Sequence, residues 1–336
     1  MQSGERAVTA GSVAWTSADR IRACLQGIAT GDAVGKQTET LAQKDIARWY
    51  PKGVRGFEGI PGDVIPRYAG NSKRAWRIGE TTDDTERTIA VVRAIIRDRR
   101  VSHASVGREM LGCRKCVHPG IKSLWEFHQA ADPARIATMH DGCGAAVRVA
   151  PVGILHAPPD LDALVDAARE ASISTHGGAL AIAAAAATAA AVSAAVEGAS
   201  SQEVLTFVER AAATAESRGP GGAAGVFAGS IRAVHDGLAT MSAIGAGDVA
   251  RAWFPDRPLT IVPLALALAT VMQSAEEAIL LAANVGGDSD SVASIAGGIL
   301  GAMHPQTVNQ QWYEVVEEVN GHNLVAIAGE LARLRH

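Results

Sequence analysis

The chain has 336 residues, is 48% hydrophobic and carries a formal net charge of −4. It is long enough for one or two large buried cores, and the lack of a long basic run excludes the charge pattern typical of nucleic-acid-binding proteins. Residues 1–15 lack the continuous apolar stretch of a signal peptide, so we expect a cytoplasmic protein.

Helical patterns follow one another along the chain. The first predicted helix is capped by Ser17, ends at Gly31 and carries apolar residues at i, i+3, i+4 and i+7. Residues 37–82 are rich in Gly and Pro and predict a long loop or flap. A helix then runs from Asp83 to about Arg97. Further helices are predicted at about residues 120–131, 160–172, 177–197, 201–216, 223–237, 246–253, 262–282, 290–302, 307–319 and 322–334.

These patterns favour one all-α domain over residues 18–336, preceded by a flexible extension at residues 1–17. Alternating runs of Val, Ile and Thr that would indicate strands are missing, and aromatic residues make up only 4% of the chain. The alanine-rich stretch from Gly177 to Val196 predicts a buried helix rather than a membrane span. Close packing between helices is predicted by a stripe of small residues, which comprises Ala293, Gly297 and Gly301.

The cysteines and one glycine-rich stretch carry weaker signals. Cys113 and Cys116, with His118 nearby, resemble half of a zinc site, but a structural zinc ion needs four ligands and no second pair is present. A pair of reduced surface thiols is therefore expected. Residues 219–225 lack the Lys-Ser/Thr of a P-loop and predict a turn between helices.

Two acidic clusters carry the strongest functional signal. The first reads Thr-Thr-Asp-Asp-Thr-Glu over residues 81–86, and the second reads Gly-Gly-Asp-Ser-Asp-Ser over residues 286–291. Each places two acids and several hydroxyl groups at the start of a predicted helix. If the clusters face each other, they supply the hard oxygen ligands that Mg²⁺ and Mn²⁺ prefer. Without a cation, so many neighbouring acids would repel one another.

Each cluster alone also has a structural explanation. Acids in the first turn of a helix cap free N–H groups and interact with the helix dipole, at about 0.3–1 kcal/mol each. This explains one acid but not three within residues 83–86. The second cluster also resembles the start of an EF-hand loop, but Val292, Ala293 and Ile299 occupy positions where that loop needs a ligand, a glycine and a glutamate. Together the clusters indicate a functional site.

Five motifs follow one another along the chain. They are GDAVG at residues 31–35, TDDTE at 82–86, GCGAAVRVAPVG at 142–153, STHGG at 174–178 and GGDSDSVASIAGGILGA at 286–302. In these motifs and their order, the sequence resembles the ADP-ribosylglycohydrolases. The resemblance covers roughly residues 18–335. It implies an all-α orthogonal multi-helix bundle with two Mg²⁺ or Mn²⁺ ions, acting on ADP-ribosyl groups of proteins or of related small molecules.

The resemblance also implies roles for individual residues. The implied metal ligands are Thr82, Asp83, Asp84, Asp288, Asp290 and Ser291. Glu39 matches a glutamate on a mobile flap, and the candidate catalytic groups are Glu39, Asp84 and Asp288. The candidate substrate-binding residues are Asp141, Gly142, Cys143, Gly144, Arg148 and His176. For His176, the alternatives are a place in the wall of the substrate cleft and a structural hydrogen bond at the start of a helix.

Two departures from the family pattern bear on ligand binding. Ser291 stands where threonine is usual, but it keeps the hydroxyl oxygen, so metal binding should survive. The family's glycine loop commonly reads Gly-Ser-x-Gly-Asn-Gly and holds a pyrophosphate, whereas residues 139–144 read Met-His-Asp-Gly-Cys-Gly. A carboxylate of Asp141 that faced the cleft would repel a pyrophosphate.

The sequence therefore predicts a metal-dependent hydrolase that cleaves a ribosyl glycosidic bond, with an ADP-ribosyl group as the default substrate. One alternative is the same fold acting on another nucleotide or nucleoside-like N-glycoside in specialised metabolism, which the altered glycine loop favours. Another is a non-catalytic module that binds ADP-ribose or a nucleotide, although none of the main acids is lost. We expect no nucleic-acid or membrane partner, and the sequence leaves the oligomeric state open.

Overall fold

The computed structural model describes residues 14–57, 76–219 and 225–335, and the regular structure in these ranges is entirely helical. The first half of the chain contains α1 (Ser17–Gly35), α2 (Gln43–Trp49), α3 (Asp83–Asp98), α4 (His103–Met110), α5 (Lys122–Ala130), α6 (Ala150–Leu155), α7 (Leu161–Ser172) and α8 (Ala179–Val196). The second half contains α9 (Ser201–Arg218), α10 (Val226–Ala239), α11 (Ala246–Trp253), α12 (Pro258–Val271), α13 (Ala275–Val285), α14 (Ser289–Met303), α15 (Gln310–Asn320) and α16 (Leu324–Ala332). The predicted all-α fold class is confirmed.

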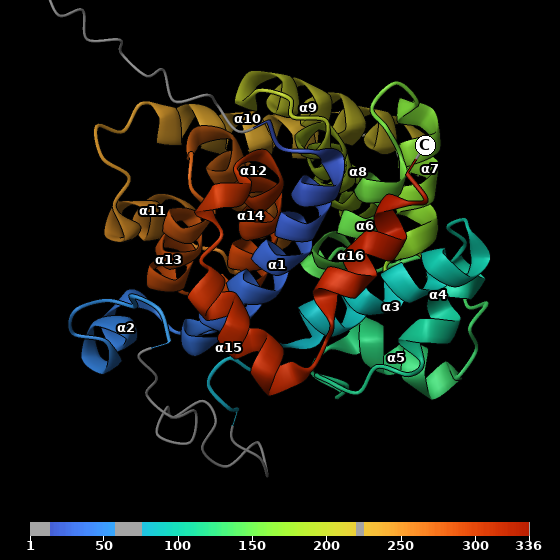
Figure 1. Ribbon diagram of the computed structural model, residues 1–336, viewed down its shortest axis with the longest axis horizontal. Helices are drawn as coiled ribbons and strands as arrows, with labels where there is room; N and C mark the ends of the chain where they lie inside the picture. The colour runs from blue at the N-terminus through green and yellow to red at the C-terminus, as the bar shows by residue number, and fades with distance from the viewer. Residues whose placement is uncertain (1–13, 58–75, 220–224, 336) are drawn as a thin grey trace, which may run out of the picture.

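Helices α1 and α14 lie side by side at the centre of the fold (Figure 1). Their backbones approach closely: a Cβ atom at Gly27 would lie 2.2 Å from the carbonyl oxygen of Gly297, and one at Gly31 would lie 2.2 Å from that of Ala293. No side chain fits at such distances, so both positions require glycine. The predicted close packing of the small-residue stripe is confirmed. This contact places the end of α1 beside the start of α14.

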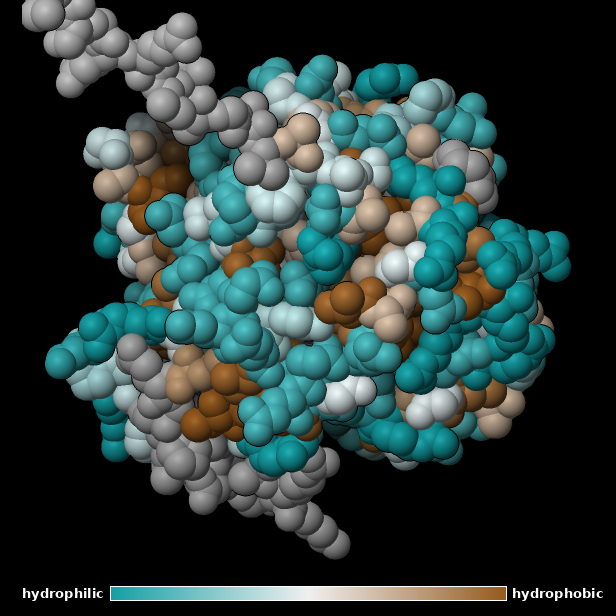
Figure 2. Space-filling model, in the orientation of Figure 1, coloured by the Kyte–Doolittle hydropathy of each residue, from teal (hydrophilic) through white to brown (hydrophobic). Residues whose placement is uncertain are grey.

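The other helices surround this pair. Helices α15 and α16 lie across the front of α1 in Figure 1, while α12 and α13 pack against α14. Helix α8 packs against α6 and α9; it is the one described helix long and apolar enough to cross a membrane, but 83% of that span is buried in the fold. Figure 2 shows this face of the molecule as mostly hydrophilic, with hydrophobic residues in small separate groups.

Several predicted boundaries are wrong. Helix α1 is capped by Thr16 rather than Ser17 and continues through Gly31 to Gly35, because packing against α14 supports glycine inside the helix. The predicted helix over 262–282 is two helices, since the side chain of Ser274 caps α13. Helix α2 lies within the predicted loop, and α4 and α6 were not predicted.

Some predictions fall partly outside the described residues. Residues 1–13 of the predicted N-terminal extension, residues 58–75 of the predicted flap and residues 220–224 of the predicted turn are in this group. The described part of the flap includes Glu39, which follows a short 3-10 turn at Lys36–Thr38. This turn directly follows α1. Glu39 lines the same cleft as Asp83 and Asp84 of the first acidic cluster.

Candidate active site

A cleft of about 550 Å³ opens where the ends of several helices meet. The first turns of α3 and α14 form part of its wall, and the segment between α11 and α12 forms another part. The predicted site residues that line it are Glu39, Asp83, Asp84, Gly142, Cys143, Gly144, His176, Asp288, Asp290 and Ser291. Thr82, Asp141 and Arg148 do not line it.

The first acidic cluster is held in place by Asp32, a residue that the sequence analysis did not single out. Asp32 is fully buried in α1, and its carboxylate accepts hydrogen bonds from the backbone N–H of Thr82 (2.9 and 3.0 Å) and of Thr85 (3.1 Å). The Thr82 hydroxyl in turn accepts a bond from the Asp84 N–H at 3.1 Å and caps α3. The sequence signal that could have identified Asp32 is an acid within an otherwise apolar, buried helix.

The second cluster begins in a backbone conformation that favours glycine. Gly286 and Gly287 have φ values of +83° and +68°. Asp288 follows at the N-cap position of α14, but its side chain makes no capping hydrogen bond. Helix capping therefore does not explain Asp288, and its carboxylate lines the cleft instead.

The two clusters meet in this cleft. The Ser291 hydroxyl donates a hydrogen bond to Asp84 Oδ2 at 3.0 Å, which joins the first turns of α3 and α14. Carboxylate and hydroxyl oxygens suit Mg²⁺ or Mn²⁺, so the chemistry of the donor set fits such an ion. Among the described residues, no three His, Cys, Asp or Glu side chains stand close enough together to hold a metal ion. Binding one would therefore require these side chains to move.

The acids of the cleft are difficult to ionise. Burial raises the pKa of Asp84 well above its ordinary value, and the charges of Asp32 and Asp288 raise it further. Burial also raises the pKa of Asp290 well above its ordinary value, with a further contribution from Glu39. The pKa of Asp288 is raised mainly by burial. A bound cation would oppose these shifts because it favours the ionised carboxylates.

These shifts predict that Asp290→Asn stabilises the metal-free protein increasingly as the pH rises. Below pH 3.8, the ordinary pKa of an aspartate, Asp290 is protonated in both the unfolded and the folded chain, so it does not lower the free energy of unfolding. Above pH 3.8, Asp290 releases its proton in the unfolded chain before it does so in the folded chain. The free energy of unfolding of the wild type therefore falls by up to about 1.4 kcal/mol per pH unit relative to the variant. Urea denaturation of both proteins in EDTA at pH 4.5 and pH 8 measures this; a difference that does not change with pH contradicts it.

Two cationic side chains neutralise part of the negative charge. Arg87, one turn after Asp83 on α3, forms an ion pair with the Asp83 carboxylate. Lys36 forms an ion pair with Glu39, and its Nζ lies 4.7 Å from the ring centroid of Trp76. The sequence analysis did not single out either cation, because each lies just outside a motif. Arg87 directly follows the first acidic cluster, and Lys36 directly follows the GDAVG motif.

Asp141, predicted to bind substrate, does not line the cleft. Its Oδ1 accepts hydrogen bonds from the backbone N–H of Leu180 at 2.9 Å and of Ala181 at 3.3 Å, both in the first turn of α8. Gly178 at the N-cap position has no side chain that could do this. Asp141 therefore caps α8 from a distant part of the chain.

We expect Asp141→Ala to destabilise the protein by about 1 kcal/mol, the usual cost of losing a helix cap. Asp141→Asn keeps the acceptor oxygen and should retain most of the stability. Because the carboxylate lies outside the cleft, neither change should alter the affinity for ADP-ribose. Urea denaturation and calorimetry test the two statements. Tighter ADP-ribose binding by the alanine variant would show that the carboxylate acts on the cleft after all.

Arg148, predicted among the substrate-binding residues, holds the glycine loop in position and does not line the cleft. It is completely buried and stands behind the glycine loop. Its guanidinium donates hydrogen bonds of 2.7–3.0 Å to the carbonyl oxygens of Gly144, Ala171 and Ser172 and to the hydroxyl of Thr175. These bonds tie the glycine loop to the segment that precedes α8.

His176 combines both of the roles considered for it. It lines the cleft, and its two ring nitrogens lie 2.7 Å from the Thr175 hydroxyl and 3.3 Å from the Ser123 hydroxyl. Burial lowers its pKa well below the ordinary value, and the positive charges of Arg148 and Arg87 lower it further. The imidazole is therefore neutral at physiological pH, and its engaged nitrogens make it part of the wall rather than a free general base.

The thiols are not a surface pair, which corrects the prediction for Cys113 and Cys116. Cys113 is only 4% exposed, and Cys116 lines the cleft. Both are free cysteines, and burial raises their pKa values to about 12 and about 11, so neither is a thiolate at neutral pH. Cys143 Sγ lies 3.1 Å from Asp288 Oδ2 and brings a third sulfur close to the acids.

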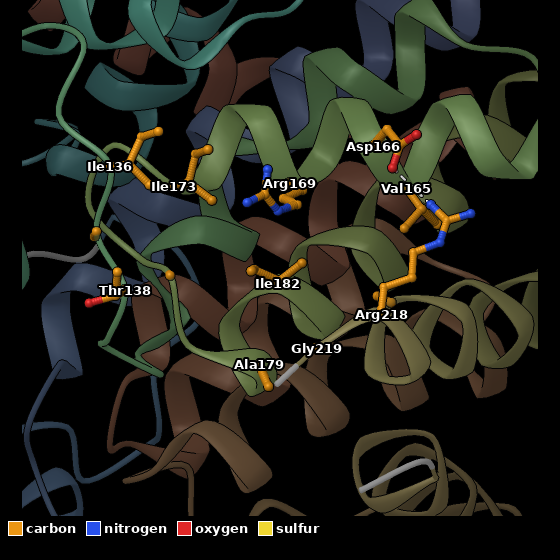
Figure 3. A pocket seen from close by; sticks show the side chains of 13 residues that line it. Ile136, Thr138, Val165, Asp166, Arg169, Ile173, Ala179, Ile182, Arg218 and Gly219 are labelled. Carbon is orange, nitrogen blue, oxygen red and sulfur yellow. Dashed lines mark hydrogen bonds and ion pairs between the residues drawn. The ribbon is translucent and has the colours of Figure 1, made fainter. Parts of the chain in front are cut away.

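A second, smaller cavity of about 230 Å³ lies between α7, α8, α9 and residues 136–138 (Figure 3). Apolar side chains such as Ile173 and Ile182 form much of its lining. At one edge, Arg218 Nη1 contacts Asp166 Oδ1 at 2.8 Å. None of the predicted site residues lines this cavity, so the larger cleft is the candidate active site.

Comparison with known proteins identifies relatives and the fold. A protein of Archaeoglobus fulgidus described as uncharacterized is 27% identical over 311 residues, covering 89% of this chain and 92% of its own length. The Escherichia coli protein YegU, also described as uncharacterized, is 26% identical over 313 residues, covering 85% of this chain and 88% of its own. The solved structure of an "ADP-ribosylglycohydrolase-related protein complex" shares the fold, with a TM-score of 0.69 at 23% identity over 95% of this chain and 99% of that one.

The family model of the ADP-ribosylglycohydrolases matches residues 15–336, which is nearly the whole chain. The match includes every acid of the cleft and the glycine loop. This protein therefore belongs to the ADP-ribosylglycohydrolase family.

Proposed function

We propose that this protein is a metal-dependent hydrolase that cleaves a ribosyl glycosidic bond, with an ADP-ribosyl group on a protein or small molecule as its substrate. The observation that carries the proposal is the hydrogen bond between Ser291 and Asp84, because it joins two distant acidic clusters in one cleft. Membership of a family of ADP-ribosylglycohydrolases supports the reaction type.

Hydrolysis breaks the C1′–N or C1′–O bond of the ribose and forms a C1′–O bond to water, through an oxocarbenium-like state. A divalent ion held by the acids of the cleft would supply Lewis acidity. In this proposal Asp84 or Asp288, which both line the cleft, accepts the proton that the attacking water loses, and the leaving group takes up a proton as it departs. Glu39 lines the cleft and pairs with Lys36, and in this proposal it positions that water.

The remainder of the cleft suits a nucleotide-like ligand. Its volume of about 550 Å³ is that of a small-molecule site, and Phe254 and Ile261 add an apolar wall. Gly142 and Gly144 of the glycine loop both line the cleft. Since Asp141 caps α8, its charge no longer argues against a pyrophosphate at this loop.

A second candidate function keeps the same chemistry with another nucleoside-like N-glycoside as substrate. The observation that favours it is the Cys143 thiol, which occupies the glycine loop and contacts Asp288. A sulfur with a raised pKa is a poorer hydrogen-bonding partner for a polar ligand than an asparagine amide.

A product screen tests the proposal. The wild type is incubated with Mg²⁺ or Mn²⁺ and with ADP-ribosyl-arginine, ADP-ribosyl-serine, O-acetyl-ADP-ribose or NAD, and the released ADP-ribose is quantified by mass spectrometry. Release that stops in EDTA and in the Asp288→Asn variant is the expected result. Full activity in the chelator contradicts metal dependence. Binding of ADP-ribose without cleavage of any substrate would indicate a non-catalytic module.

A further inference from the structure

We propose that Arg87 takes the place of one metal ion in the acidic cleft, so that the centre binds a single divalent cation through Asp84, Asp288, Asp290 and Ser291. The inference rests on the proposed metal-dependent function and concerns how many ions this chain binds. It differs from the two-ion centre that the family resemblance implies, and the difference comes from a side chain of this protein.

Arg87 forms part of the wall of the cleft. Its side chain is only 4% exposed and forms an ion pair with Asp83, one turn earlier on α3. Its Nη1 lies 3.2 Å from the point where a Cβ atom of Gly144 would stand. The lack of a side chain at Gly144 therefore leaves room for the guanidinium, which lies between the first acidic cluster and the glycine loop.

Arg87 and Asp83 depend on each other. The Arg87 Nε is buried and has no hydrogen-bond partner, so the ion pair with Asp83 is the main compensation for its buried charge. If Asp83 turned to a metal ion instead, it would bring a dication next to the guanidinium and weaken the pair that compensates it. Asp83 is therefore the acid of the first cluster that is already neutralised from within the chain.

The pairing of charges also sets Asp83 apart from the other acids of the cleft. The aspartates of the two clusters are Asp83, Asp84, Asp288 and Asp290, and Glu39 is already paired with Lys36. Of these four aspartates, Asp83 is the one whose carboxylate forms an ion pair with Arg87. A single divalent ion bound by Asp84, Asp288 and Asp290 leaves that ion pair intact.

The other oxygen ligands form a group that does not involve Arg87. Ser291 Oγ contacts Asp84 Oδ2 at 3.0 Å, which brings the second cluster to Asp84 rather than to Asp83. Cys143 Sγ contacts Asp288 Oδ2 at 3.1 Å on the same group. If their side chains move closer together, these hard oxygen atoms from two helix starts can hold one divalent ion.

Manganese binding tests the inference independently of activity. The metal-free full-length protein is titrated with Mn²⁺ by calorimetry, and the loaded samples are measured by electron paramagnetic resonance. We expect one Mn²⁺ per chain and the six-line spectrum of an isolated ion. Arg87→Gln removes the charge and should admit a second Mn²⁺, with an exchange-coupled spectrum. Arg87→Lys keeps the charge and is the matched control, with one ion expected.

Two Mn²⁺ ions in the wild type, no bound ion, or a single ion in Arg87→Gln would each overturn the inference. If the glutamine variant does not fold, as judged by circular dichroism, the neighbouring aspartates decide it. Asp83→Asn should then change the affinity for Mn²⁺ by less than about threefold, whereas Asp84→Asn should lower it by more than about 100-fold; equal losses contradict the proposal. The product screen is separate: a wild type that binds one ion but cleaves no ribosyl bond refutes the proposed function alone.

Discussion

Asp290→Asn is expected to lower kcat/KM for ribosyl-bond hydrolysis on the order of 10³-fold, because an active-site charge is lost while the shape of the side chain is kept. Asp290 is 4% exposed, lines the cleft and lies in the first turn of α14. Its Oδ1 accepts a hydrogen bond from the Ser291 N–H at 3.1 Å, which the asparagine carbonyl oxygen can also accept. The variant should therefore fold normally and lose activity, rather than lose both.

Initial rates at saturating Mn²⁺, with a substrate identified by the product screen, measure this effect. Asp248→Asn is the matched control, because it removes the same charge from a side chain that is 59% exposed on α11. That control should stay within about twofold of the wild type. If Asp290→Asn retains comparable activity, Asp290 acts only in the local structure at the start of α14 and is not part of the catalytic centre.

Arg148→Met is expected to produce the largest loss of stability, about 3 kcal/mol in the free energy of unfolding. Methionine fills much of the same volume but leaves the buried oxygens of Gly144, Ala171 and Ser172 without their donor. Each unsatisfied buried acceptor costs about 1–3 kcal/mol. The loss is partly offset because the variant no longer buries a charge; burial of that charge is what lowers the pKa of Arg148.

Urea denaturation of the metal-free protein measures this loss, and the melting temperature should fall by about 5 °C or more. Arg148→Lys keeps the charge but cannot reach all the acceptors with its three donors, so an intermediate loss is expected. A decrease below about 1 kcal/mol for the methionine variant would mean that water or a backbone shift replaces the lost hydrogen bonds.

Most helices could be predicted from the sequence because their signals are local. The predicted helix at 201–216 corresponds to α9, where Ser200 and Glu203 form a capping box, and the one at 160–172 corresponds to α7, which Asp160 caps. Prediction failed where packing overrides propensity, as at Gly31, which sits inside α1 against α14. It also failed at Ser274, because the flanking apolar residues suit a helix and no glycine or proline marks the break between α12 and α13.

By itself, the sequence determined the all-α class, the family and the two acidic clusters, since periodicity and short motifs depend on residues that are close along the chain. Only the tertiary structure decided what each charged side chain contacts. Asp141 caps a helix that begins almost forty residues later, Asp32 holds the start of α3, and Arg87 joins the wall of the cleft. Such contacts depend on how the helices pack, and no local pattern in the sequence records the hydrogen bonds and ion pairs that this packing creates.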